Sequence, residues 1–193
     1  MNKIVLASCN NYSRPEDRAH NDLRKLCGYN IDLLKQMSGL IESMQQKAFA
    51  GFNYAQAVGP HFRHVIEHYA ALLTTLAQGS FCVDYDTRER NVELQNIPAL
   101  TLAKIQELIE QFESLVSQKS FEPGLPLTTR LRSGLSGEDI MTADSSLARE
   151  LLFVASHALH HFAFVDHHCR QAGVELGRDF GKAPSTIAFE RGA

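Results

Sequence analysis

Histidine is the residue type that is most unevenly distributed along this chain of 193 residues. Eight of its nine histidines fall in two short stretches, 61–68 and 157–168. In the first stretch, His61, His64 and His68 stand at i, i+3 and i+7, which places them along one face of a helix. This face lies on the flank of the aliphatic stripe, a position that can line a cavity between packed helices.

The second stretch repeats this helical spacing. His157 and His161 stand at i and i+4, the spacing at which two imidazoles reach one metal ion from consecutive turns. Glu150 lies one heptad before His157, and His168 lies one heptad after His161, so both share their face. The remaining histidines of this stretch lie on a different face: His160 and His167.

Together the two stretches can supply three neutral nitrogen ligands, a set that suits Zn, Ni, Fe or Cu. We predict His64, His157 and His161 as the ligands, with His61 and His68 as alternates from the first stretch. Any one of these histidines alone is more typical of a partly buried structural residue. Burying several uncoordinated imidazoles side by side costs desolvation free energy, and this favours a metal site.

Apolar residues recurring at threes and fours predict four long helices that position these residues. Pro60 and Pro98 suit first helical turns, because a proline there loses no hydrogen bond, and Asp144 suits an N-cap. The predicted helices cover 21–48, 60–78, 98–117 and 145–171. We therefore expect an all-α fold, a single four-helix-bundle domain over 1–193, with a long crossover between the third and fourth helices.

The connecting segments are less regular. The stretch 80–96 contains a charged run and is predicted to be an ordered loop without a core strand. In the crossover, the residues from 127 to 132 follow an alternating pattern like that of a strand. This predicts a small β-hairpin or a long irregular loop. The tail 174–193 has no strong period and is expected to pack over one end of the bundle.

Composition excludes several classes of protein. The formal net charge is −3 and the pI about 6.3, so there is no basic excess to bind nucleic acid. We also expect no signal peptide, no membrane span and a cytoplasmic location. The cysteines form no C-x-x-C pair and are expected to be free thiols: Cys9, Cys27, Cys82 and Cys169. Motifs of esterases, NTPases, dinucleotide-binding proteins and zincins do not occur.

Three segments taken in order resemble a known family. GPHFRHVIEHY at 59–69, DYDTRER at 84–90 and SHALHHFAF at 156–164 are together similar to the DinB/YfiT-like superfamily of metal-binding four-helix bundles. The segment 179–187 is similar to the tail of one branch of it. The resemblance implies a nickel or zinc ion held by His64, His157 and His161. It also implies thiol-dependent transferase or isomerase chemistry in some relatives, frequent dimers, and neither polymerase activity nor DNA binding.

Two further groups are candidates for binding or catalysis. Asp84, Tyr85, Arg88 and Arg90 can form an anion-recognising edge beside the metal, or simply a solvated loop with surface ion pairs. Glu150 can orient a ligating histidine, act as a general base on water, or pair with a nearby arginine. Covalent cysteine chemistry is not expected, because the cysteines have no base nearby in sequence or lie within helical core patterns.

Two functions therefore follow from the sequence. The first is a metal-dependent enzyme, in which a divalent ion activates a low-molecular-weight thiol or water for attack on a small molecule. The alternative is a non-catalytic bundle that binds metal structurally or works through dimerisation. An open coordination position distinguishes the first function from the second.

Overall fold

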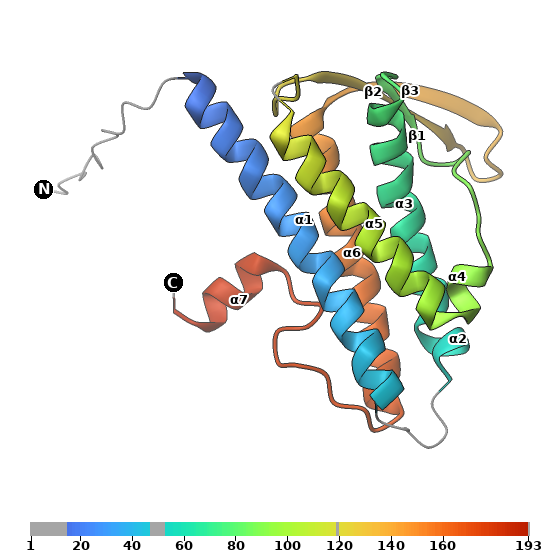
Figure 1. Ribbon diagram of the computed structural model, residues 1–193. Helices are drawn as coiled ribbons and strands as arrows, with labels where there is room; N and C mark the ends of the chain where they lie inside the picture. The colour runs from blue at the N-terminus through green and yellow to red at the C-terminus, as the bar shows by residue number, and fades with distance from the viewer. Residues whose placement is uncertain (1–14, 47–52, 119, 193) are drawn as a thin grey trace, which may run out of the picture.

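The computed structural model describes residues 15–46, 53–118 and 120–192, and this part of the chain is mostly helical with a small three-stranded sheet at one end (Figure 1). Its long helices are α1 (Pro15–Gln46), α3 (Gly59–Ala77), α5 (Pro98–Ser117) and α6 (Leu147–Gln171). Its short helices are α2 (Tyr54–Ala57), α4 (Glu93–Asn96) and α7 (Pro184–Glu190). None of the helices in the described part of the chain combines the length and the apolar character that crossing a membrane requires.

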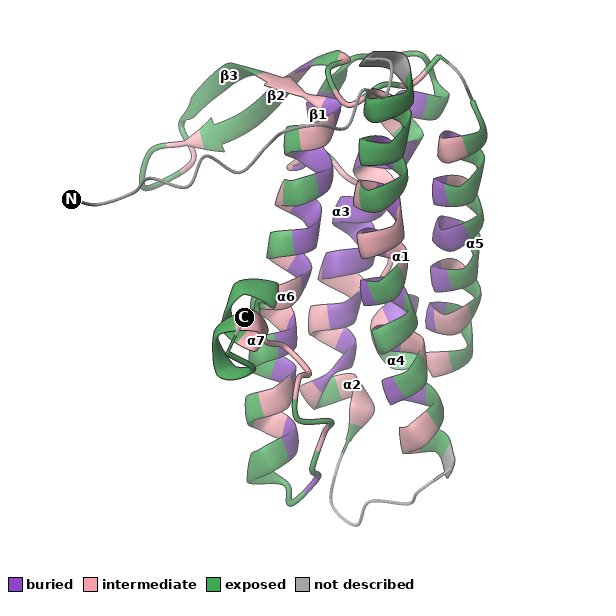
Figure 2. Ribbon diagram, turned by 90° about the vertical axis from the view of Figure 1, so that its left-hand side faces the viewer, coloured by how far each residue is buried: buried purple, intermediate pink, exposed green. Residues whose placement is uncertain are grey.

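The long helices bury a common core. Helix α1 packs against α5 and α6, and α3 packs against the same two helices. Each long helix contributes fully buried side chains, among them Leu34, Phe62, Phe112 and Phe162. Burying each such side chain contributes about 1.5–3 kcal/mol to folding. In Figure 2 the buried residues lie on the faces that these helices turn toward one another.

Two of the predicted helices agree with α3 and α5 to within one residue. Helix α1 begins earlier than predicted, at Pro15, where a proline fits the first turn; its predicted end at residue 48 lies outside the described residues. The predicted start of α6 was wrong. Asp144 lies in a strand, and the N-cap is Ser146, whose side chain accepts a hydrogen bond from the Arg149 amide at 3.3 Å.

The sheet contains β1 (Cys82–Asp84), β2 (Pro126–Ser133) and β3 (Asp139–Ser146), in that order. Strands β2 and β3 form the antiparallel hairpin that the alternating pattern predicted. The loop prediction for 80–96 was wrong, because β1 pairs in parallel with β2 and α4 follows it. Val83, the central residue of β1, is fully buried, whereas the charged run begins directly after it. A strand of three residues is too short to show a period.

The C-terminal segment lies along α6 rather than over an end of the helices, which corrects the prediction for the tail. The ring of Phe180 stacks on Phe162, in the middle part of α6, with centroids 5.0 Å apart. Gly181 follows with a φ of +72°, and its α-carbon lies against the backbone of Phe162. A side chain at Gly181 would strain the backbone and crowd the helix, so this glycine allows the close approach.

Candidate metal centre

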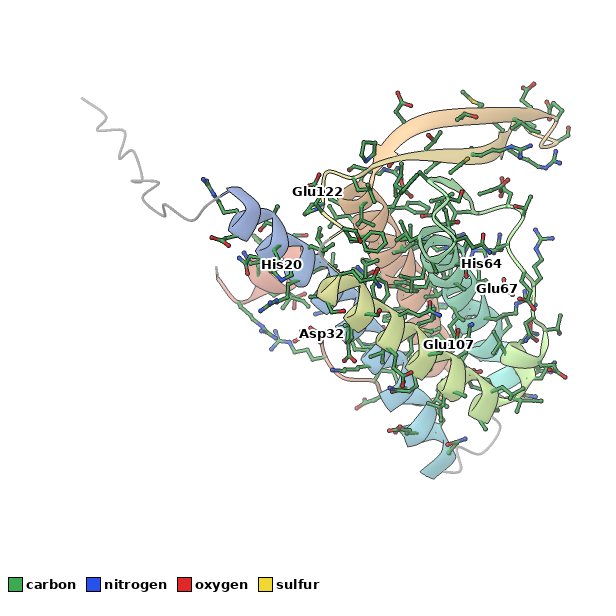
Figure 3. All side chains as sticks on the ribbon, turned by 45° about the horizontal axis from the view of Figure 1, so that its top comes forward. His20, Asp32, His64, Glu67, Glu107 and Glu122 are labelled. Carbon is green, nitrogen blue, oxygen red and sulfur yellow. The ribbon has the colours of Figure 1, made fainter. Side chains whose placement is uncertain are left out.

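Five histidine rings form one cluster between α3 and α6. His61, His64 and His68 come from α3, and His157 and His161 come from α6. Neighbouring rings have centroids 4.3 to 5.3 Å apart. Figure 3 labels His64 on α3 within this region. The two stripes that the spacing predicted therefore face one another across a helix pair.

The three histidines whose ligand atoms lie closest together include two predicted metal ligands, His64 and His157, and one alternate ligand, His68. His64, His68 and His157 each offer a ligand atom, and these atoms all lie within 4.8 Å of one another. His161, predicted as the third ligand, instead brings its Nδ1 within 3.0 Å of Nδ1 of His61. The ring of His161 still lies 4.7 Å from the rings of both His64 and His157. The first stretch thus supplies two histidines to the tight group rather than one.

Two rings of the tight group present an uncommitted nitrogen. Nδ1 of His68 lies 2.8 Å from the carbonyl oxygen of His64, so it carries the proton and donates it. The lone pair of His68 is then on Nε2. Nε2 of His157 is buried and has no hydrogen-bond partner among the described residues. A buried polar atom without a partner costs free energy, and a metal ion at this nitrogen would remove that cost.

His64 is held differently. Nη2 of Arg88 lies 3.0 Å from Nδ1 of His64. Because a guanidinium only donates, Nδ1 accepts, and the proton of the neutral ring is on Nε2. Arg88 is itself fixed, since its Nη1 donates to the Tyr85 carbonyl at 2.7 Å and its Nε lies 3.4 Å from Oε2 of the buried Glu67. Metal ligation by His64 therefore competes with Arg88.

Burial keeps these imidazoles neutral at pH 7. Desolvation lowers the pKa of His64 to about 3, and the neighbouring histidines and Arg88 lower it further. The same cause lowers the pKa of His157 to about 4 and that of His161 to about 3. His61 and His68 also have lowered pKa values, again mainly through burial. Neutral imidazole is the form that ligates a metal. These histidines therefore need not be deprotonated before they bind one.

Glu150 reaches the cluster through Tyr85. The Glu150 side chain is fully buried and accepts hydrogen bonds from the Tyr85 hydroxyl at 2.7 Å, from the Ser145 hydroxyl and from Arg149. The ring of Tyr85 stacks on His68, with centroids 5.5 Å apart. The arginine partner of Glu150 is thus Arg149, and the carboxylate fixes a ring that packs on a histidine.

The predicted anion-recognising edge is only partly assembled. Tyr85 and Arg88 contact the cluster, as described above. Asp84 instead shapes its own loop, because its Oδ1 accepts two following backbone amides and its Oδ2 lies 3.8 Å from Arg130. Arg90 is exposed. Of the four residues, Tyr85 and Arg88 therefore contact the histidines, and Arg88 already pairs with the Glu67 carboxylate.

Sequence reasoning did not find two residues of the site. Phe153 stacks on His157 with centroids 5.8 Å apart and also contacts the ring of Tyr85, so it forms an apolar wall. Its position one turn before His157 on the same helical face was the available signal. Glu67 carries the charge that balances Arg88, and its spacing of four from Arg63, its other ionic partner at 3.5 Å, could have indicated a pair.

Of the cysteines that the structure describes, the two buried ones are unsuited to act as nucleophiles. Cys27 and Cys169 are buried in the core, and burial raises their thiol pKa to about 12 and about 11. Cys82 is exposed on β1, and the three are free thiols. Cys9 lies outside the described residues. The low pKa that a reactive thiol needs is therefore not produced at either buried position.

Comparison with known proteins leaves the family of this chain open. No family model matches it, and no solved structure matches it. It is similar to a protein named FK506-binding protein 5 from Rhizopus delemar, with 31% identity over 108 residues. The match covers 54% of this chain but 26% of that protein, so it spans about a quarter of the relative's length. Fold and site together define a mostly helical protein with a histidine cluster between two helices.

Proposed function

We propose that this chain is a divalent-metal-binding protein of the DinB/YfiT-like type, in which α1, α3, α5 and α6 form a four-helix bundle. The observation that carries the proposal is the buried, unpartnered Nε2 of His157 beside His64 and His68, with ligand atoms within 4.8 Å. A structural histidine core would be expected to pair this nitrogen. The resemblance of the sequence to that superfamily also implies a metal ion bound by His64 and His157, but with His161 in place of His68.

The donor set fits a borderline transition metal. Neutral imidazole nitrogens suit nickel, zinc or iron, whereas magnesium and calcium prefer oxygen ligands. Three protein ligands leave a coordination position open in a tetrahedral site. The chemistry supplied by such an ion is Lewis-acid activation of a low-molecular-weight thiol or water for attack on a small electrophilic molecule.

The surrounding residues have distinct roles in this proposal. Arg88 binds and orients an anionic group of the small-molecule substrate, because its guanidinium lies at the edge of the cluster. Tyr85 and Phe153 exclude water from the faces of His68 and His157. Glu150 positions Tyr85 and is a poor general base, since its buried oxygens already accept from three donors.

The expected partners are a small molecule and a low-molecular-weight thiol. The net charge of −3 argues against nucleic acid. A homodimer is expected from the family resemblance. The name of the FK506-binding relative supplies no ligand for this proposal, because this chain spans about a quarter of that protein.

Metal content tests the binding proposal. Full-length protein without a histidine tag is purified in the absence of chelators and analysed for nickel, zinc and iron. We expect the parent to retain metal and His157→Ala to lose it, with circular dichroism unchanged. His160→Ala is the matched control, since His160 is exposed on the same helix. Equal metal content in the parent and His157→Ala would contradict the proposal.

The open position is tested separately. Replacing the metal with cobalt(II) and adding a small thiol should produce a sulfur-to-cobalt charge-transfer band, which His157→Ala should not show. A cobalt-loaded protein with no such band would favour the alternative function, a non-catalytic metal-binding or dimerisation bundle. The band would instead justify screening thiols together with small electrophiles for turnover.

A further inference from the structure

We infer that the pocket between α3 and the segment 84–91 binds a neutral, hydroxyl-rich small molecule of the sugar or polyol class. In Figure 1 the segment after β1 runs beside α3 before it reaches α4. The pocket is separate from the histidine cluster, because none of the described residues that line it is a histidine. The inference therefore goes beyond the proposed function and does not depend on it.

The pocket is large enough for such a molecule. Its volume is about 560 Å³, within the range of roughly 300–1,000 Å³ that is typical of small-molecule sites. Ala70 and Ala71 of α3 line it with short side chains, which leave this space open. Ile66 and Leu94 are buried and add apolar surface to its lining. Apolar surface of this kind can pack against the C–H groups of a sugar ring.

The polar part of the lining consists largely of hydroxyl and amide side chains. Groups of these kinds both donate and accept hydrogen bonds, as the hydroxyls of a sugar do. Thr74, Gln78 and Thr87 are exposed, and their side chains form no hydrogen bond within the described part of the chain. The hydroxyl of Thr75, by contrast, already donates to the Ala71 carbonyl at 2.8 Å. Three side chains are therefore free to bond a ligand.

The charges around the pocket are balanced, which favours a neutral ligand over an ion. Four of the five charged residues that line it lie within 3.8 Å of an opposite charge: Glu67 and Arg88 with one another, Lys104 with Glu107, and Asp84 with Arg130. The fifth, Glu89, is exposed, so solvent screens its charge. The lining residues that the structure describes thus leave no unpaired cation to select an anion.

Two buried polar atoms at the pocket lack hydrogen bonds. Oε2 of Glu67 and Nε of Arg88 are buried, and neither has a hydrogen-bond partner among the described residues. The two atoms lie 3.4 Å apart, which is longer than an ordinary hydrogen bond. After a small rotation of the Arg88 side chain, a ligand hydroxyl can donate to this carboxylate and accept from this guanidinium. One hydroxyl group then satisfies both atoms.

Binding of neutral disaccharides to the full chain tests the inference. Trehalose and maltose are the probes, and saturation-transfer NMR measures their affinity. Ala71→Leu fills the pocket and should weaken binding by about tenfold or more. Thr74→Val removes a hydroxyl at nearly constant shape and should weaken binding by about three- to tenfold. Circular dichroism confirms that both variants fold.

Matched controls place the binding in this pocket. Ala103 and Thr186 are exposed on α5 and α7 and do not line it, so Ala103→Leu and Thr186→Val should bind both sugars as the parent does. Trehalose 6-phosphate adds negative charge and should bind no more tightly than trehalose. Failure of the parent to bind either sugar would overturn the inference. So would equal binding by the parent and Ala71→Leu, or tighter binding of the phosphate.

Alkylation of Cys82 gives a second readout. Cys82 is an exposed free thiol that lines the pocket. Bound trehalose should slow its reaction with iodoacetamide in the parent but not in Ala71→Leu, and peptide mass spectrometry separates Cys82 from the other cysteines. An unchanged rate at saturating trehalose would contradict the inference.

One variant separates this inference from the proposed function. His157→Ala should lose the metal and still bind trehalose, because His157 does not line the pocket. Loss of trehalose binding in this variant would place the sugar at the histidine cluster and overturn the inference. Metal retained in His157→Ala with trehalose binding unchanged would contradict the proposed function alone.

Discussion

Arg88 and His64 are joined by a contact that opposes metal binding. Nη2 of Arg88 lies 3.0 Å from Nδ1 of His64, and the permanent positive charge of the guanidinium stands at the edge of the histidine cluster. A guanidinium at this place repels a divalent cation and occupies a nitrogen of a proposed ligand. The carboxylate of Glu67, 3.4 Å from Nε of Arg88, offsets part of this charge. If the cluster binds a metal ion as proposed, Arg88 lowers its affinity for that ion.

Replacing Arg88 with methionine should strengthen metal binding. Arg88→Met removes the positive charge and frees Nδ1 of His64, so zinc affinity of the stripped protein should rise by about tenfold or more, equivalent to about 1.4 kcal/mol. Isothermal titration of both proteins measures this change. Arg90→Met is the control, because Arg90 is exposed, and its affinity should equal that of the parent. Weaker binding in Arg88→Met would show that the arginine supports the metal site.

The pKa values of the histidines predict how the stability of the metal-free protein depends on pH. Burial lowers the pKa of His64 to about 3 and that of His157 to about 4, from 6.5. At pH values between the lowered pKa and 6.5, the unfolded chain binds more protons than the folded chain. The free energy of unfolding therefore falls as the pH falls through 6.5. Urea denaturation should give a lower midpoint at about pH 5 than at about pH 7.

A variant checks that these histidines cause the pH dependence. In the double variant His64→Asn/His157→Gln the two titrating groups are gone, and the midpoint should change less between the same two pH values. Both side chains are half-buried, so solvent reduces the size of the effect but not its sign. An equal pH dependence in the variant and the parent would assign the effect to other groups.

Removing the hydroxyl of Tyr85 should destabilise the fold without removing metal. Tyr85→Phe deletes one of three hydrogen bonds to the buried Glu150 carboxylate, which should lower the free energy of unfolding by about 1.5–3 kcal/mol. The phenylalanine ring can still stack on His68, so metal content should stay at the parental level. Denaturant unfolding and elemental analysis test the two parts. Tyr29→Phe, at a half-buried position on α1, should change stability far less.

Periodicity predicted the long helices because they repeat their pattern over many turns. Helices α3 and α5 were located to within one residue, and the hairpin followed from its alternation. Strand β1 was missed, since Val83 is its buried residue and three residues show no period. The start of α6 was misplaced because Asp144 and Ser146 are both good N-caps, and pairing within the hairpin selects between them.

Helical spacing also predicted that the two histidine stripes can contribute ligands to one site. It could not predict which of the rings lie closest to one another. The axial offset between α3 and α6 decides whether His68 or His161 joins His64 and His157, and it is set by packing of the aliphatic faces. The contact between Arg88 and His64 could not be predicted either. It depends on the path of a loop held by Glu67 and Tyr85, which are distant from one another in sequence.

The start of α3 depends on a glycine whose replacement should be costly. Gly59 packs directly against the backbone of α4, where an added β-carbon would overlap the Gln95 carbonyl oxygen. Because that obstacle is backbone, Gly59→Ala should force α3 and α4 apart and lower the free energy of unfolding by about 1–3 kcal/mol. Gly28→Ala is the matched comparison, since Gly28 lies within α1 and has open space around its β-position. There the substitution should raise stability by about 0.5–1 kcal/mol through helix propensity. Urea denaturation measures both, and a Gly59→Ala variant as stable as the parent would contradict the close packing of α3 on α4.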